Sequence, residues 1–342
     1  MYLCNYTDKD LNDRFGMIRF PKSKALQLEQ EGKIKIVDKN DTITKVIHDY
    51  KTNDTQLKSN HLQDKKKKIA WVQDNSKEGG AEISNKRLRT IGLSLGFAIC
   101  LITPQQFDYS SLLTADLIII YNIFEFSPEQ YKKIYHVIYE LRKPYIKYDH
   151  DHREMKRPYI ATQLFTLSKL NIFLSPEHKK RSIEVYGKQI ERYSIALPLS
   201  IDNNFYINKG LERKDDSVFI PCLRKCHKNF LNYFEQNKNL TYTIISDNNF
   251  ISNSAKQKVI KRVTQNEMIN LYNTHKYMFH EPDSFWAGER IYFESLLCGC
   301  IPIVNDNVGH YSWGKDYNLD NLKSAGIIFW KQVDNVIESR YS

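Results

Sequence analysis

The chain of 342 residues has no hydrophobic run long enough to cross a membrane. A membrane-spanning helix needs about 20 consecutive apolar residues. The longest apolar stretches, at residues 95–103 and 115–123, have instead the length of strands buried on both faces. The N-terminal residues show neither the basic segment nor the apolar core of a secretory signal. These features predict a cytoplasmic protein, with peripheral contact to a membrane left open.

Cysteine is scarce, and two well-known glycine motifs are missing. The six cysteines stand at positions 4, 100, 222, 226, 298 and 300, and their spacing resembles no disulfide framework. Neither the 222/226 pair nor the 298/300 pair has the C-x-x-C spacing of structural zinc sites. The chain also lacks G-x-G-x-x-G and the P-loop motif. We therefore expect a reducing compartment, no bound metal and no cofactor.

Positive charge is the main compositional excess. Fifty lysines and arginines face forty acids, which gives a formal net charge of +10. Such an excess favours an anionic partner: a phosphorylated ligand, a membrane surface or a nucleic acid. The basic residues are spread along the chain and form no known nucleic-acid motif, so a nucleic-acid partner ranks last.

Residues 1–67 differ from the rest of the chain and form a predicted N-terminal extension. Residues 17–38 suggest a strand, a short helix and a second strand. Residues 49–68 are almost devoid of apolar side chains and resemble a linker. Its end, Lys65–Lys68, is either a solvated segment or a patch that binds lipid or phosphate.

From residue 68 onward, short apolar strands alternate with amphipathic helices. The predicted strands are 69–73, 97–103, 116–122, 144–149, 171–175 and 191–199, and the helices are 82–95, 127–142, 161–170 and 176–187. The series then restarts with strands 217–221, 241–246, 260–264, 277–281, 301–305 and 326–330 and helices 228–236, 265–275 and 289–299. Such alternation indicates βαβ units and parallel sheets. We predict two doubly wound, Rossmann-like α/β domains, at 68–200 and 201–342, with a cleft between them.

Ligands of open α/β sheets bind beyond the carboxyl ends of the strands. This rule directs attention to the loops after residues 73, 149, 221, 281 and 305. In the first loop, Gly79 and Gly80 precede a helix, where backbone N–H groups can approach an anion closely. Two glycines before a helix are also common in plain tight turns.

The loop after residue 221 carries Arg224, Lys225 and Lys228 where the next helix begins. Cations are unfavourable at a helix N-terminus unless an anion lies between them and the helix dipole. An arginine with a lysine suits a diphosphate. The alternative is a solvated basic turn.

A third candidate is the stretch Glu289–Glu294. Arg290 and Glu294 are four residues apart and so share one helical face. Glu294 on a mostly apolar helix either accepts the hydroxyls of a ribose or pairs internally with Arg290.

The loop after residue 149 is rich in groups that exchange protons. Asp149, His150 and Asp151 stand together, and His152 follows. The H-x-H spacing without an adjacent third ligand is poor for zinc. A histidine or aspartate that acts on a sugar hydroxyl is the favoured interpretation.

Taken in order, these segments resemble group 1 glycosyltransferases of the GT-B fold, family 4-like. The stretch VTQNEMINLYNTHKYMFHEPDSFWAGERIYFESLLCGCIPIV (263–304) is similar to their C-terminal donor-binding signature. LNIFLSPEHKKRSIEVYG and SIALPLSIDNNFY resemble the end of their first domain, and GGAE after the first strand is also typical. The matches span residues 69–337.

The resemblance implies roles for the candidate residues. Arg224 and Lys228 would bind the donor diphosphate, with Gly79 and Gly80 beside it. Glu294 would bind the ribose, and His150 would act near the transferred sugar. Further contacts with the donor sugar or the acceptor are expected from these residues: Asp149, Asp151, Glu281 and Arg290.

One position departs from the family pattern. Trp286 stands where the family has the first of two acids eight residues apart, and Glu289 or Glu281 is the expected substitute.

The predicted activity is transfer of a hexosyl group from a nucleotide-diphosphate sugar to a hydroxyl of a glycan or lipid-linked acceptor. We expect retention of configuration and no metal. The alternative is a catalytically inactive relative that binds nucleotides or glycans.

Overall fold

The computed structural model describes residues 2–6, 18–20, 26, 29–31, 34–38, 66–74, 80–150, 158–202, 204–246 and 256–339. Contacts between Cα atoms divide the chain into two compact units. The first comprises Met1–Asn75 and Gly96–Tyr145, and the second Ser76–Leu95 and Ile146–Ser342. No helix in the described part of the chain is both long and apolar enough to traverse a lipid bilayer.

The first unit begins with a small antiparallel sheet. Strands β1 (Tyr2–Tyr6), β2 (Ile18–Phe20) and β3 (Ile34–Asp38) pair in the order β2-β1-β3. The two strands predicted within residues 17–38 are confirmed as β2 and β3, whereas β1 was not predicted. The predicted linker falls almost entirely outside the described residues.

A parallel sheet of six strands follows, in the order β5-β4-β6-β7-β8-β9. Its strands are β4 (Lys68–Val72), β5 (Ala98–Ile102), β6 (Leu117–Ile120), β7 (Tyr145–Asp149), β8 (Leu170–Phe173) and β9 (Ser194–Ala196). The intervening helices are α3 (Gly80–Ser94), α4 (Tyr109–Thr114), α5 (Pro128–Tyr135), α6 (Pro158–Leu167) and α7 (Pro176–Tyr186). A π-helical turn, His136–Glu140, extends α5, and a 3-10 helix, Lys188–Tyr193, precedes β9. The predicted alternation is therefore confirmed, although the strand expected from residue 191 is shorter.

Helix boundaries in this part follow capping chemistry that the sequence makes visible. Ser127 and Gln130 form a capping box at the start of α5, with Pro128 in the first turn. Ser175 caps α7, and Gly187 ends it at φ +98°.

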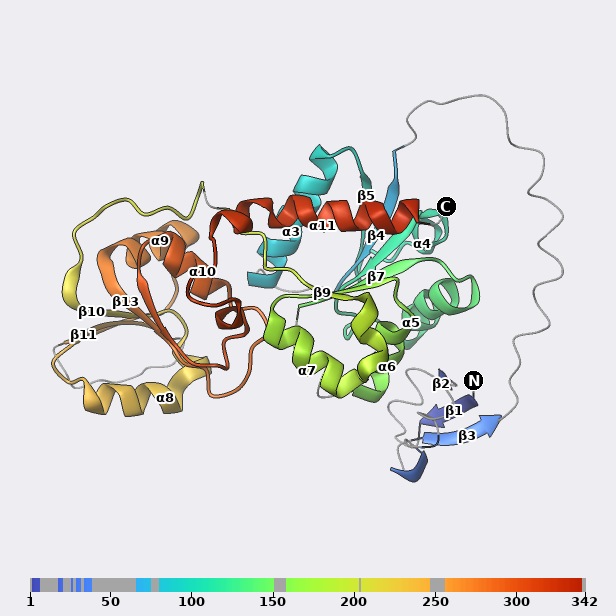
Figure 1. Ribbon diagram of the computed structural model, residues 1–342, viewed down its shortest axis with the longest axis horizontal. Coiled ribbons are helices and arrows are strands. Elements are labelled where there is room, and N and C mark those ends of the chain that lie inside the picture. The colour runs from blue at the N-terminus through green and yellow to red at the C-terminus, as the bar shows by residue number, and fades with distance from the viewer. Residues whose placement is uncertain are drawn as a thin grey trace. The chain divides into compact units, whose positions relative to one another are not determined.

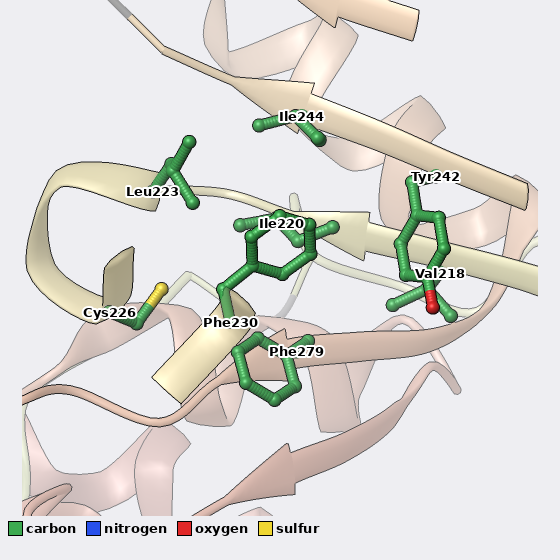
Figure 2. Close-up of a cluster of buried hydrophobic side chains, with 8 residues drawn as sticks. All are labelled: Val218, Ile220, Leu223, Cys226, Phe230, Tyr242, Ile244 and Phe279. Atoms are coloured by element: carbon green, nitrogen blue, oxygen red, sulfur yellow. The ribbon is translucent and has the colours of Figure 1, made fainter. Parts of the chain in front are cut away.

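The second unit also contains a parallel sheet of five strands, ordered β12-β11-β10-β13-β14. Its strands are β10 (Lys214–Ile220), β11 (Thr241–Ile245), β12 (Gln257–Ile260), β13 (His275–His280) and β14 (Ile301–Val304). Helices α8 (Leu223–Gln236), α9 (Gln265–Thr274) and α10 (Arg290–Leu297) and a 3-10 helix, η4 (Gly309–Trp313), connect them. Figure 2 shows the apolar core that joins α8 to this sheet, where Phe230 packs edge-on against Tyr242 and Phe279.

Helix α8 begins five residues earlier than predicted and bends at Cys226 (φ −128°, ψ 25°). The predicted basic loop is thus the first turn of this helix. The Cys226 side chain belongs to the apolar core (Figure 2), where burial raises the pKa of its thiol. The cysteine at residue 226 is therefore explained by its packing in this core.

The predicted strand at residues 326–330 is wrong. These residues lie within α11 (Asp320–Glu338), which crosses α3 in Figure 1. A short apolar run cannot be assigned to strand or helix by periodicity alone. Here Phe329, Val333 and Ile337 recur at helical spacing and are buried. The indole N–H of Trp330 donates to the carbonyl of Leu88 in α3 at 2.6 Å.

Candidate functional site

The carboxyl ends of β10 and β13 are neighbours, and both carry charge. Arg224 and Lys228, in the first turns of α8, are exposed to solvent. The carboxylate of Asp283, just after β13, accepts the backbone N–H of Asn229 at 3.2 Å and of Lys228 at 3.4 Å. An acid of the chain itself therefore lies at the start of the straight part of α8. It supplies part of the negative charge that the sequence argument assigned to a ligand.

Glu289, a predicted catalytic residue, is buried in an ion pair. Its carboxylate accepts from Lys225 Nζ at 2.6 Å and lies 3.5 Å from His280 Nε2. Burial raises the pKa of Glu289, but Lys225 and His280 outweigh burial and lower it to about 2. Lys225 also lies 3.7 Å from the centre of the Trp286 ring. Glu289 is consequently ionised at neutral pH and suited to electrostatic stabilisation.

Arg290 and Glu294 form the internal pair that the sequence left as an alternative. Arg290 Nε donates to Glu294 at 2.9 Å, and both side chains are buried. Tyr206 lies close enough for Glu294 to raise the pKa of this phenol, in addition to the effect of burial. The Tyr272 hydroxyl lies 3.5 Å from Glu294.

Arg290 also reaches the first turns of α3. Its Nη1 donates to Ser84 Oγ at 2.7 Å. A Cβ atom at Gly80 would lie only 3.1 Å from Arg290 Cδ, so this glycine allows the arginine to approach the helix start. Ser84 gave no signal in the sequence, because its partner is 206 residues away.

At the carboxyl end of β7, the polar side chains are bonded to one another. Asp149 accepts from His178 Nε2 at 3.1 Å and lies 3.7 Å from Lys147 Nζ, and all three side chains are fully buried. Asp149, predicted to contact sugar, is therefore a partner of His178. His150, next in sequence, is also buried, and its pKa falls to about 3 because of burial and the proximity of His310.

His310 in η4 was not predicted as a site residue. It is completely buried, and burial lowers its pKa to about 4. Its Nδ1 lies 3.1 Å from the carbonyl oxygen of Glu289. The signal available was its position in the loop after residue 305, one of the loops expected to carry function.

The remaining predicted residues are placed as follows. Glu281 is half-buried at the end of β13, and burial raises its pKa. Gly79 and Asp151 lie outside the described residues. Within the described ranges, no group of three or more His, Cys, Asp or Glu side chains is arranged to hold a metal ion.

Chemically, this arrangement combines two properties. Arg224 and Lys228 present positive charge to solvent, which suits an anion. His150 and His310 are neutral at physiological pH, which suits hydroxyl groups better than charged ones.

Known structures share this fold at low sequence identity. Anabaena Alr3699/HepE, solved with UDP-glucose, is 13% identical with a TM-score of 0.55, over 79% of this chain and 91% of that one. A Rickettsia africae glycosyltransferase is 12% identical with a TM-score of 0.57, over 80% of this chain and 88% of that one. The catalytic domain of Arabidopsis thaliana starch synthase IV, bound to ADP and acarbose, is 8% identical with a TM-score of 0.53, over 79% of this chain and 93% of that one. No family model and no curated protein matches the sequence. The likeness confirms the predicted fold class: two Rossmann-like domains, as in GT-B glycosyltransferases.

Proposed function

We propose that this protein is a glycosyltransferase that moves a sugar from a nucleotide-diphosphate sugar to a hydroxyl of an acceptor. One observation carries the proposal: on a GT-B fold, exposed cations, buried carboxylates and neutral histidines gather at the carboxyl ends of the strands. HepE is described with UDP-glucose and starch synthase IV with ADP, so nucleotide-linked donors suit this fold.

Different charged residues bind the diphosphate and the ribose of the donor. Arg224 and Lys228 bind the diphosphate and stabilise the charge that builds on it as it leaves. Glu294 binds the ribose through its carboxylate, which Arg290 holds in place. Gly79 and Gly80 let the chain approach the phosphates closely.

The transition state of glycosyl transfer is oxocarbenium-like and positively charged at the sugar. Glu289, ionised and buried, stabilises that charge, and Glu281 is the alternative acid. His150 orients a sugar hydroxyl. Asp149 holds His178, which is close enough to affect the pKa of His150. Asp151 and Arg290 complete the contacts with donor sugar or acceptor. We further propose hexosyl transfer with retention, without a metal, to a glycan or lipid-linked acceptor.

The direct test is release of nucleotide from a panel of UDP-, ADP- and GDP-sugars, with and without glycan acceptors. We expect turnover with at least one donor and a loss of about 100-fold or more in the Glu294→Gln variant, because a neutral amide cannot accept both ribose hydroxyls. Glu235→Gln, which changes an exposed acid on α8, is the matched control. A wild-type protein that turns over no donor in the panel contradicts the proposal.

A second candidate is a non-catalytic relative that binds the donor without transfer. Trp286 favours it, since the ring stands at the position of an acid and is packed against Lys225. Thermal stabilisation by a nucleotide sugar without nucleotide release would support this candidate.

A further inference from the structure

One nitrogen of His310 has no hydrogen-bond partner among the residues that the structure describes. The carbonyl of Glu289 can only accept, so Nδ1 of His310 carries the proton and donates to it. In the neutral ring, Nε2 is then a bare acceptor. This atom is buried and unsatisfied. Buried polar atoms are nearly always satisfied, so an open acceptor indicates a missing donor.

The ring is held firmly in this orientation. Phe293 packs against it with ring centres 4.6 Å apart. The preceding residue, Gly309, donates its N–H to the carbonyl of Trp286 at 2.8 Å, and a Cβ atom there would lie 2.2 Å from the carbonyl oxygen of Ala287. Any other residue at position 309 would displace η4, so this close approach fixes the backbone that carries the ring.

The surroundings of His310 belong to the candidate site. After burial, His310 has the largest effect on the pKa of His150, and Arg290 acts on both histidines. The contrast with His178 is informative. That ring accepts from the N–H of Leu174 at 3.3 Å and donates to Asp149 at 3.1 Å, so both of its nitrogens are used within the protein.

We propose that Nε2 of His310 accepts a hydrogen bond from a hydroxyl group of the carbohydrate substrate. This proposal rests on the proposed function and assigns to His310 the recognition of one sugar hydroxyl. Ionised phosphate and carboxylate oxygens only accept, so they cannot satisfy this nitrogen. A hydroxyl can donate to it without bringing charge into a buried place.

Two substitutions separate this role from a structural one. In His310→Asn, the side-chain amide can still donate to the Glu289 carbonyl, but nothing replaces Nε2. In His310→Gln, a polar atom reaches the position of Nε2, but the bond to Glu289 is lost. We expect His310→Asn to lose about tenfold or more in kcat/KM, the value of one neutral hydrogen bond whose partner is left unpaired, and His310→Gln to lose less.

Deoxy donors identify the hydroxyl. With the donor found in the panel, wild type should lose about tenfold on one deoxy analogue, and His310→Asn should not distinguish that analogue from the parent. If His310→Asn slows donor hydrolysis in the absence of acceptor, the hydroxyl belongs to the donor sugar. If His310→Asn slows only transfer to the acceptor, the hydroxyl belongs to the acceptor.

His275→Asn is the matched control, because both nitrogens of His275 are bonded within the protein at the opposite end of β13. It should lower the melting temperature without changing sugar selectivity. Equal activity of the two His310 variants, or a greater loss in His310→Gln, would overturn the assignment while the proposed function stands. A wild type inactive on every donor would overturn both.

Discussion

The carboxyl ends of β7 and of β10 with β13 carry similar residue types but use them in opposite ways. Beside β7, Lys147, Asp149 and His178 are fully buried and bonded to one another. Beside β10, Arg224 and Lys228 extend into solvent, although acids lie nearby. The first set neutralises its charges internally, and the second leaves cations available.

The difference follows from the cost of burying charge. A buried ion that loses its partner is strongly destabilising, whereas an exposed one contributes little to folding. Charges beside β7 therefore hold the buried His178 in place, whereas the exposed Arg224 and Lys228 beside β10 remain available to bind an anion. The four changes below test this division, from the largest expected effect to the smallest.

Asp149→Ala should cost about 3–5 kcal/mol in the free energy of unfolding, because Lys147 would remain buried without its counter-ion. Urea denaturation measures the change. Adding Lys147→Met should recover much of the loss by removing the stranded charge. Asp215→Ala, which breaks an exposed pair with Lys276, is the control and should cost far less. An unchanged urea midpoint in Asp149→Ala would show that the buried set is not coupled.

Glu289 should make the protein sensitive to acid. Its folded-state pKa of about 2 lies below that of an unfolded glutamate, so its contribution is present above about pH 4.5 and is lost as the pH falls toward 2. The contribution is on the order of 3 kcal/mol. Lys225→Met should abolish this part of the pH dependence, as measured by denaturation at pH 5, 4 and 3, because it removes the cation that lowers the pKa. Lys276→Met should retain it, and identical pH curves for both variants would refute the account.

Arg224→Ala and Lys228→Ala should each lower kcat/KM for the donor by about 10- to 100-fold, the range for a hydrogen bond to a charged group. Their stability should stay within about 0.5 kcal/mol of wild type, because both side chains are exposed. Lys238→Ala, just beyond the end of α8, is the control and should change neither value. Normal donor kinetics in both variants would place the diphosphate elsewhere.

Asp283→Ala should cost about 1 kcal/mol, as the loss of a helix cap does. It should leave the donor KM equal or lower, since the carboxylate repels a phosphate bound to the neighbouring cations. Thr264→Ala removes the cap of α9 and should cost a similar amount without affecting KM. A KM that rises as steeply as in Arg224→Ala would mean that Asp283 positions the cations.

Most of the fold was predictable, and the errors have local causes. Alternating apolar runs placed most strands and helices of both sheets, and caps such as Ser127 mark helix starts in the structure. The failure at residues 326–330 arose because a five-residue apolar run fits a strand as well as one face of a helix. Only the packing of Trp330 and Gly326 on α3 decides between them.

The candidate site was less predictable, because its partners are distant in sequence. The spacing of Arg290 and Glu294 raised an internal pair as an alternative, and the structure forms it. The links from Glu289 to Lys225 and from Arg290 to Ser84 join residues 64 and 206 positions apart. No local pattern indicates them. His310 was missed although it lies in the loop after residue 305, because its burial and its bond to Glu289 appear only in the folded chain.

By itself, the sequence determined that this chain forms parallel α/β sheets with polar residues in the loops at their carboxyl ends. It could do so because periodicity and capping depend on residues a few positions apart. The tertiary structure alone decided which acid neutralises which cation and that Nε2 of His310 is buried without a partner among the described residues. Those outcomes depend on burial and on neighbours that only the folded chain brings together.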